Sequence, residues 1–303
     1  MVKTLVEHKI RIKNLTKYYG PHKGIENLDL EVASGEIFGF LGPNGAGKTT
    51  TIRCLMSILL PTSGDMWING DKISRKNTEI KNKIGYIPGE LYLPEYFNVN
   101  DFLDYIESMR KSKSPKRKEL VDMFQLPTDK KISELSKGNK QKVGLIAAFM
   151  HDPDVLILDE PTSGLDPLLQ QKLYDLVLDA KKRGKTVFFS SHNLAEVQKI
   201  CDRVGIIKDG SLVSVEDVDS LNRNVPRVLE VTLNNINQER LDSLGMKLLD
   251  IKDNKIRILI TQGDSIKDFL NLIIPMEPIE LSYPPASLQE YFMTFYDKKI
   301  KEE

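Results

Sequence analysis

Eight residues near the start of the chain combine glycines, a lysine and a threonine in a pattern that can bind phosphate. Gly42-Pro43-Asn44-Gly45-Ala46-Gly47-Lys48-Thr49 fits G-x-x-x-x-G-K-[ST]. Glycines let the backbone curl so that several N–H groups point at one anion. Lys48 can reach the terminal phosphates of a nucleoside triphosphate, and Thr49 can offer its hydroxyl to Mg2+. The motif therefore predicts a nucleotide site rather than a glycine-rich turn that binds no ligand.

A second chemical feature is a pair of adjacent carboxylates at the end of an apolar run. The run Val155-Leu156-Ile157-Leu158 leads directly into Asp159 and Glu160. Such a run is typical of a buried parallel strand. Its end would place Asp159 at Mg2+ and Glu160 beside the γ-phosphate, where Glu160 fits a general base that accepts a proton from attacking water. The alternative, a solvated turn, leaves the wholly apolar run unexplained.

The elements that must position these residues follow from the hydrophobic pattern. The segment Glu36–Leu41 predicts a strand before the phosphate loop, and Thr50–Met56 predicts a helix after it. Leu168–Lys182 has the spacing of an amphipathic helix, and Thr186–Ser190 reads as another buried strand. Alternating strands and helices predict an α/β fold with a mainly parallel sheet covered on both faces.

Three regions depart from this alternation. Residues from about Ile10 to Ile37 predict short strands joined by turns, and Met66–Ile68 predicts a hairpin strand. From Asn100 to about Leu135 the pattern is helical and highly charged. After Asp209-Gly210 the pattern predicts a small α+β domain of ferredoxin-like type, which we expect to be a structural appendage rather than a second active site. Its predicted strands are 228–233, 247–251, 255–260 and 278–283, and its predicted helices are 238–244, 266–272 and 287–296.

Composition restricts the partners and the compartment. The 303 residues contain 43 Lys and Arg and 43 Asp and Glu, and this balance argues against a general nucleic-acid binder. Cys54 and Cys201 lack pairing or metal spacing, which favours buried thiols in a reducing cytosol. No signal-peptide core and no apolar run approaching the ~20 residues of a membrane span are present. We therefore expect a soluble, cytoplasmic protein.

Three more motifs occur in a fixed order around the carboxylate pair. Leu135–Gln141 precedes an apolar helix at Val143–Met150, Ser163–Asp166 follows the pair, and Ser190-Ser191-His192 ends the next strand. Together with the phosphate loop and the carboxylate pair, these motifs closely resemble the nucleotide-binding subunit of ABC (ATP-binding cassette) transporters. The resemblance covers roughly residues 4–215.

The resemblance implies a P-loop NTPase fold of the RecA-like type for residues 1–215. Within it, an antiparallel β subdomain would accompany a helical subdomain at about 90–150. Residues 216–303 would form a C-terminal accessory α+β domain. The resemblance also implies ATP and Mg2+ as cofactors, a second ATPase subunit and a separate integral membrane permease, with no nucleic acid.

Around the nucleotide, the resemblance assigns a role to several residues of this chain. Tyr19 would stack on the adenine ring, with its neighbour Tyr18 as the alternative. The segment from Gly42 to Thr50 would hold the phosphates, and Lys48 would take part in catalysis. His192 would also be catalytic, as a switch residue that hydrogen-bonds the γ-phosphate.

Further implied residues would act on the ATP of a second subunit. Ser136 and Gly138 belong to the signature segment, which would contact the γ-phosphate held by the partner. Asp166 would link the two sites across the dimer. The functional unit would therefore be a head-to-tail pair with two ATP molecules between the subunits. Lys137 and Asn139 stand where the common family pattern has Gly and Gln.

A larger departure concerns the expected magnesium site. Thr49 and Asp159 fit the family pattern of Mg2+ ligands. Most relatives also carry a glutamine that touches the Mg2+ or the attacking water, and this chain has Gly89 there. Glycine has no side chain to do this, so we predict that Glu90 partly substitutes through a one-residue shift.

These departures and the C-terminal domain resemble an exporter branch related to bacitracin- and drug-resistance ATPases. The predicted function is the ATP-hydrolysing motor of an ABC exporter, bound to the inner face of the cell membrane through its permease. The aromatic residues between Tyr86 and Tyr105 would either receive a short helix of the membrane subunit or fill the helical subdomain's core.

Several other functions are weighed against the exporter motor. A translation or DNA-associated ABC ATPase is disfavoured by the single cassette, the missing coiled coil and the neutral charge. A regulatory module that senses ATP without turnover is disfavoured because Glu160 and His192 are retained. An importer motor differs from an exporter only through the family-branch resemblance.

Overall fold

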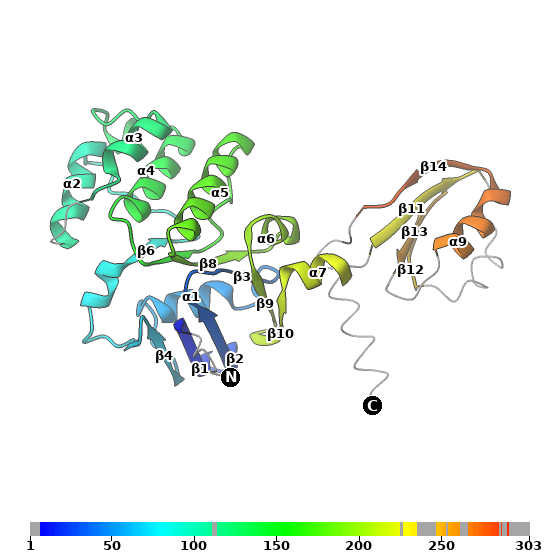
Figure 1. Cartoon of the computed structure of the whole chain (residues 1–303), viewed down its shortest axis with the longest axis horizontal. Helices are drawn as coiled ribbons and strands as arrows, with labels where there is room; N and C mark the ends of the chain where they lie inside the picture. The colour runs from blue at the N-terminus through cyan, green and yellow to red at the C-terminus, as the bar shows by residue number, and fades with distance from the viewer. Residues whose placement is uncertain are drawn as a thin grey trace, which may run out of the picture. The chain divides into compact units, whose positions relative to one another are not determined.

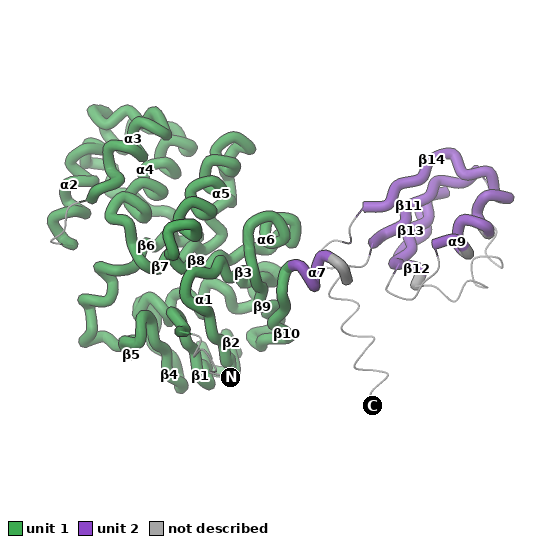
Figure 2. Tube along the Cα trace, in the orientation of Figure 1, with its two compact units in different colours: residues 1–218 green, residues 219–303 purple. Residues whose placement is uncertain are grey.

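The computed structural model divides the chain into two compact units, Met1–Val218 and Asp219–Glu303 (Figure 2). The residues it describes are 7–110, 114–224, 227–234, 247–252, 254–260, 266–284, 286 and 290. The predicted boundary at 215–216 falls inside strand β10 (Ser211–Asp217), which belongs wholly to unit 1.

Unit 1 is built on a six-stranded sheet (Figure 1). In spatial order its strands are β10, β9 (Arg203–Lys208), β3 (Ile37–Leu41), β8 (Thr186–Ser191), β7 (Val155–Leu158) and β6 (Ile84–Ile87). All neighbours run parallel except β10, which pairs antiparallel with β9. Every residue of β3, β7 and β8 is buried, as expected of central strands covered on both faces. The predicted mainly parallel sheet is confirmed.

A second, antiparallel sheet of unit 1 lies next to the phosphate loop. Its strands, in spatial order, are β2 (His22–Ala33), β1 (His8–Tyr19), β4 (Ser63–Ile68) and β5 (Asp71–Lys72). The strands β1 and β2 form a hairpin that turns at Gly20-Pro21, and each has 12 residues, longer than the short strands predicted. Buried side chains of this sheet, such as Ile12 and Leu28, share one core with Phe38 and Phe40 of β3.

Helices connect and cover the strands of unit 1. They are α1 (Lys48–Leu55), α2 (Val99–Arg110), α3 (Arg117–Phe124), α4 (Lys137–Phe149), α5 (Pro167–Lys182), α6 (Leu194–Ile200) and α7 (Val218–Asn224, its last six residues in unit 2), with the short 3-10 helices η1 (Glu79–Lys83) and η2 (Ile132–Glu134). The helices α2, α3 and α4 gather at one end of unit 1 (Figure 1). In the described part of the chain, no helix has the length and apolar character needed to cross a membrane.

One helix begins earlier than predicted. The sequence places an apolar helix at Val143–Met150, but α4 starts at Lys137. The Ser136 hydroxyl accepts a hydrogen bond from the Asn139 N–H at 3.3 Å and caps the first turn. The signature segment therefore contains the cap and the first turn of the helix.

Unit 2 is a small α+β body with an antiparallel sheet. Its strands, in spatial order, are β12 (Lys247–Lys252), β13 (Lys255–Ile260), β11 (Arg227–Leu233) and β14 (Pro278–Ser282), followed along the chain by α9 (Ile266–Ile273) and η3 (Ile274–Met276) between β13 and β14. Because β11 separates the like-directed β13 and β14, and α9 connects them, β13–α9–β14 is a split βαβ unit.

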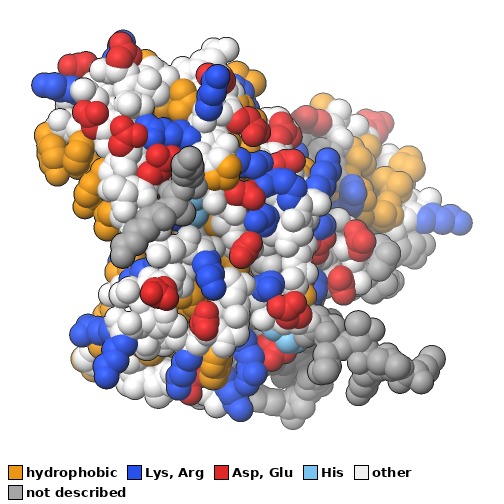
Figure 3. Space-filling view, turned by 60° about the vertical axis from the view of Figure 1, so that its left-hand side comes forward, with side chains coloured by type: hydrophobic (Ala, Val, Ile, Leu, Met, Phe, Trp, Pro, Cys, Tyr) orange, Lys and Arg blue, Asp and Glu red, His pale blue; other side chains and the backbone are white. Residues whose placement is uncertain are grey.

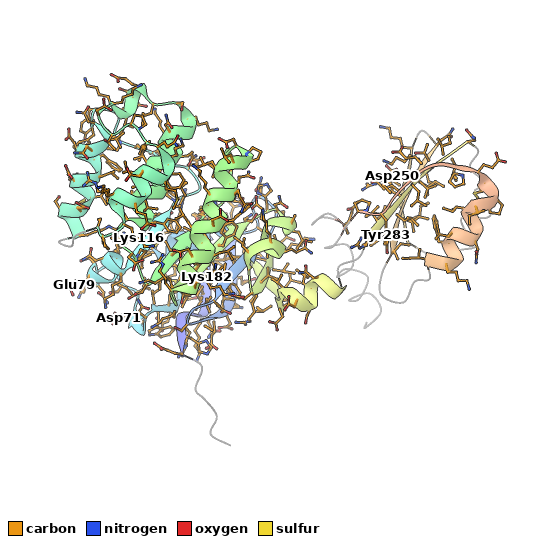
Figure 4. All side chains as sticks on the ribbon, turned by 45° about the horizontal axis from the view of Figure 1, so that its top comes forward. Asp71, Glu79, Lys116, Lys182, Asp250 and Tyr283 are labelled. Atoms are coloured by element: carbon orange, nitrogen blue, oxygen red, sulfur yellow. The ribbon has the colours of Figure 1, made fainter. Side chains whose placement is uncertain are left out.

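The core of unit 2 lies between the sheet and α9. Phe269 and Ile273 of α9 pack on Val231 and Ile258. Figure 4 shows the side chains filling this layer, with Asp250 of β12 and Tyr283 after β14 as labelled landmarks. The predicted strands and the helix at 266–272 are confirmed. The predicted helix at 238–244, and all of the one at 287–296 except residue 290, lie outside the described residues.

Candidate nucleotide site

The phosphate loop joins the end of β3 to the start of α1. Gly47 has φ +108 and precedes Lys48, the first residue of the helix. A Cβ atom on Gly47 would lie 2.7 Å from Ile25 Cγ2 and 2.9 Å from the Gly24 carbonyl oxygen. Glycine is therefore required both by the conformation and by the space. No side chain caps α1, so its first N–H groups can face an anion.

Two distant segments support the back of this loop. The Gly210 N–H donates to the Ala46 carbonyl at 3.0 Å, and the Gly210 carbonyl accepts from the Glu26 N–H at 2.8 Å. A Cβ on Gly210 would approach the Gly24 carbonyl oxygen to 2.8 Å. Backbone atoms of the β1–β2 hairpin and of the β9–β10 turn thus lie directly behind the phosphate loop.

Lys48 points its ammonium group into the loop. Its Nζ donates to the carbonyl oxygens of Gly42 at 2.6 Å and Pro43 at 3.0 Å. The same Nζ lies 3.1 Å from Glu160 Oε1, which has no hydrogen-bond partner among the described residues. The Lys48 side chain is only 5% exposed. Lys48 is therefore a desolvated cation paired with a carboxylate, at the place where the motif predicts phosphate.

Asp159 follows β7 and is fully buried. The Ser190 hydroxyl donates to Asp159 Oδ1 at 2.7 Å, and Asp159 Oδ2 has no partner among the described residues. Burial raises the pKa of Asp159, and hydrogen bonds from Ser190 and Thr49 oppose this rise. The unpaired oxygen of a buried carboxylate is suited to a divalent cation or to one of its water ligands.

Glu160 adopts an unusual backbone conformation directly after Asp159. Its φ of +47 is in the left-handed region, which few non-glycine residues occupy. Its side chain faces two basic residues, since Oε1 lies near Lys48 and Oε2 accepts a hydrogen bond from His192 Nδ1 at 2.6 Å. Glu160, the predicted general base, and His192, the predicted switch histidine, are therefore hydrogen-bonded to each other.

Two adjoining cavities lie over these groups. One, of about 270 Å³, is lined by Asn44, Thr49, Arg53, Gly89, Glu90, Glu160, Ser163 and His192. The other, of about 160 Å³, is lined by Asn44, Gly45, Gly47, Lys48, Thr49, Thr50 and Glu160. The predicted loop, base, histidine and Glu90 thus come together. Arg53 and Ser163 were not predicted; Arg53 follows Thr49 by one turn of α1, a spacing that places both on one face.

Gly89 and Glu90 form the wall of the larger cavity after β6. A Cβ on Gly89 would lie 3.3 Å from Asp159 Oδ2. The Tyr92 hydroxyl donates to Glu90 Oε2 at 3.2 Å. Gly89, which stands where most relatives have a glutamine, thus lies close to Asp159. The next residue, Glu90, adds a carboxylate to the lining of the same cavity.

Tyr19 and Tyr18 have different surroundings. The Tyr19 hydroxyl lies 3.3 Å from Thr50 Oγ1, and its ring is partly exposed beside the phosphate loop. Gly24 leaves room for this ring, because a Cβ there would lie 2.9 Å from it. The Tyr18 hydroxyl instead donates to Glu26 Oε1 at 2.5 Å. The geometry favours Tyr19 over Tyr18 as the aromatic ring that is available to stack on adenine.

Three other predicted residues do not line the cavities. Ser136 is an exposed helix cap, and Gly138 has open space where a Cβ would be. Asp166 is exposed and caps α5 by accepting from the Leu169 N–H at 2.9 Å. The structure of one chain therefore does not bring these residues to Lys48.

The aromatic residues of the helical region divide between surface and core. Tyr92 and Tyr96 are 84% and 78% exposed, whereas Phe102 is buried. The rings of Tyr96 and Tyr105 flank Phe97, with centroid distances of 4.7 and 5.7 Å. Figure 3 shows hydrophobic side chains at the edge of this helical part. Some of these aromatic residues therefore lie on the surface and others fill the core of the helical region, so both predicted placements occur.

Comparisons with known sequences agree with the motifs. The family model described as "ABC transporter" matches residues 25–163. The chain is 39% identical to the bacitracin transport ATP-binding protein BcrA of Bacillus licheniformis, over 94% of this chain and 96% of that protein. It is 35% identical to the uncharacterized ABC transporter ATP-binding protein YcbN of Bacillus subtilis, over 94% and 95% respectively.

Solved structures of similar fold cover about 70% of the chain. An ATP-binding subunit of an ABC transporter superposes with a TM-score of 0.66 and 28% identity, over 71% of this chain and 92% of that one. The ATP-binding cassette MJ0796, in a dimeric post-hydrolysis state bound to ADP and Pi, superposes with a TM-score of 0.61 and 25% identity. The match covers 69% of this chain and 98% of that one. The chain therefore belongs to the ATP-binding proteins of ABC transporters and is an ATPase with the P-loop fold of that family.

Proposed function

We propose that this chain is the motor subunit of an ABC exporter and works with separate membrane-spanning subunits. The supporting observation is the match to BcrA, which extends over 94% of the chain and so includes unit 2 as well as the cassette. Residues 216–303 would be an accessory domain, because the residues that line the two cavities all belong to unit 1.

The catalytic chemistry would be phosphoryl transfer to water. Lys48 and the loop N–H groups would hold the phosphates, and Thr49 and Asp159 would hold Mg2+, which would neutralise phosphate charge. Glu160 accepts the proton of the attacking water, and His192 holds the Glu160 carboxylate in place.

The working unit would be a head-to-tail dimer. Ser136 and Gly138 are accessible at the start of α4, where a hydroxyl and N–H groups can contact the γ-phosphate on a second copy. The dimeric form of the MJ0796 cassette supports the presence of a second ATPase subunit. ATP binding would close the dimer and move the membrane subunits, and hydrolysis would reopen it.

Transport direction can be tested in inside-out membrane vesicles. The chain would be co-expressed with the membrane protein encoded beside its gene, and bacitracin would serve as the first probe, with ATP added outside. An exporter accumulates the probe inside such vesicles, and a Lys48→Ala variant should not. An ATP-driven loss of preloaded probe would indicate an importer, and co-purification with ribosomes or DNA in place of a membrane protein would contradict a transport role.

Replacing Tyr19 by alanine should weaken ATP binding about tenfold. Stacking on an aromatic ring contributes about 1–3 kcal/mol per base, and about 1.4 kcal/mol corresponds to tenfold in Kd. Calorimetric titration with ATP measures the change. Tyr18→Phe is the matched control and should bind like the unmodified protein; equal affinities for Tyr19→Ala and Tyr18→Phe would contradict the assignment.

Replacing Glu90 by alanine should raise the Mg2+ concentration needed for half-maximal ATPase activity by about tenfold. This is the low end of the loss of metal affinity that follows removal of a residue supporting the metal ligands. The physical reason is the loss of one carboxylate from the cavity that also contains Thr49. Mg2+ titrations at fixed ATP provide the measurement. Glu95→Ala, which removes an exposed carboxylate paired with Lys140, is the control. An unchanged Mg2+ profile for Glu90→Ala would show that Glu90 does not replace the missing glutamine.

A further inference from the structure

We propose that Ser190 is a positioning residue that holds both catalytic carboxylates through one hydroxyl group. This inference rests on the functions proposed above for Asp159 and Glu160. The Ser190 Oγ donates to Asp159 Oδ1 at 2.7 Å and accepts from the Glu160 N–H at 2.9 Å. Ser190 is fully buried, so water does not replace either contact.

The direction of the two hydrogen bonds follows from chemistry. A serine hydroxyl has one hydrogen to donate, and an ionised carboxylate can only accept. The hydrogen must therefore point at Asp159, which leaves a lone pair of Oγ for the Glu160 N–H. One atom on β8 thus determines how two consecutive residues leave β7.

For Asp159, this bond selects which oxygen faces the site. Oδ1 is tied to Ser190, while Oδ2 is buried without a partner among the described residues and lies near the Gly89 position. Without the hydroxyl, Asp159 would lose the contact that distinguishes Oδ1 from Oδ2, and either oxygen could face the ligand. Ser190 therefore prepares Asp159 to offer one defined oxygen toward Mg2+.

For Glu160, the bond supports the turn that directs the side chain. The regular pairing of β7 with β8 ends at Leu158 and Phe189. Beyond this point the Glu160 N–H is bonded to the Ser190 side chain, and Glu160 has φ +47. This conformation turns the carboxylate toward Lys48 and His192. Loss of the hydroxyl should loosen the turn without removing any group that touches substrate.

The test compares Ser190→Ala with Thr186→Val, a matched control. Thr186 is also fully buried on β8, and its hydroxyl accepts from the Gly35 N–H at 2.9 Å, at the other end of the strand. Both changes remove one buried hydroxyl from the same strand. They differ in whether that hydroxyl contacts the carboxylate pair, so an effect specific to Ser190→Ala reports positioning rather than general stability.

Three measurements are made on the full chain. Amide hydrogen exchange without nucleotide or metal should show the Glu160 N–H exchanging at least tenfold faster in Ser190→Ala and unchanged in Thr186→Val. Binding of a non-hydrolysable ATP analogue should need about tenfold more Mg2+ in Ser190→Ala, with affinity in EDTA unchanged. The ATPase kcat should fall with little change in KM. If Ser190→Ala fails to fold, Ser190→Cys, similar in size but a weak hydrogen-bonding group, is used instead.

Two results would overturn the inference. One is an unchanged Glu160 exchange rate, and the other is an equal shift of the Mg2+ dependence in Thr186→Val. Nucleotide binding that ignores Mg2+ in the unmodified protein would instead contradict the proposed metal site. In that case the exchange measurement, which uses no metal, still decides whether Ser190 holds Glu160.

Discussion

Replacing Glu160 by glutamine should leave ATP binding intact and slow hydrolysis by about 100- to 10,000-fold, the usual contribution of a general base. Glutamine keeps the size of the side chain but cannot accept the proton of the attacking water. It also removes a negative charge beside the γ-phosphate, so the ATP-bound dimer should persist. The measurements are steady-state ATPase rates, and light scattering of the eluted protein with and without ATP.

A second carboxylate in unit 1 provides the control for this variant. Glu196 accepts hydrogen bonds from Ser191 at 2.6 Å and Thr162 at 3.0 Å, and it does not line either cavity. Glu196→Gln should therefore hydrolyse ATP at close to the unmodified rate. If Glu160→Gln also turned over at that rate, Glu160 would not be the base. Slow hydrolysis without an ATP-dependent dimer would support the base and contradict the proposed assembly.

Replacing Lys48 by alanine should weaken nucleotide binding by roughly 30-fold or more. Truncating one partner of a buried charge pair costs about 2–5 kcal/mol, and each 1.4 kcal/mol is tenfold in Kd. The loss has two parts, since Lys48 both pairs with Glu160 and bridges the carbonyls of Gly42 and Pro43. Calorimetric titration with ATP is the direct measurement.

The control for Lys48 is a lysine of similar chemistry away from the site. Lys72 is paired with Asp65 at 2.7 Å on the surface and lines neither cavity, so Lys72→Ala should bind ATP like the unmodified chain. Thermal unfolding of both variants separates loss of the ligand contact from loss of the fold. An unchanged ATP affinity for a folded Lys48→Ala protein would refute its part in the phosphate loop.

Local patterns in the sequence were sufficient to predict the main elements of the site. The strand β7 is wholly apolar, β8 has an apolar centre at 187–189, and the phosphate loop is a contiguous motif with a strand before it and a helix after it. Each of these signals depends on neighbouring residues only. The apolar pattern begins only at Val143 because residues 137–142 are polar, whereas α4 starts at Lys137, where Ser136 caps its first turn.

Contacts between distant segments were not predictable in the same way. The bond between Glu160 and His192 depends on β7 and β8 being adjacent and in register, which no single motif encodes. Ser190 was overlooked as an individual residue because a serine at the end of an apolar strand gives no signal of its own. Only the fold shows that its hydroxyl meets two residues of the neighbouring strand.

The backbone contacts behind the phosphate loop have a consequence for how the chain folds. Gly24 and Gly210 belong to segments near opposite ends of unit 1, and contacts between such distant segments form late because long loops must close first. The loop therefore gains its shape only after both segments have docked. A fragment ending after β8 would contain the whole motif without the β9–β10 turn that shapes it. Since ATP binds the assembled form, its binding energy stabilises all of unit 1 and not the loop alone.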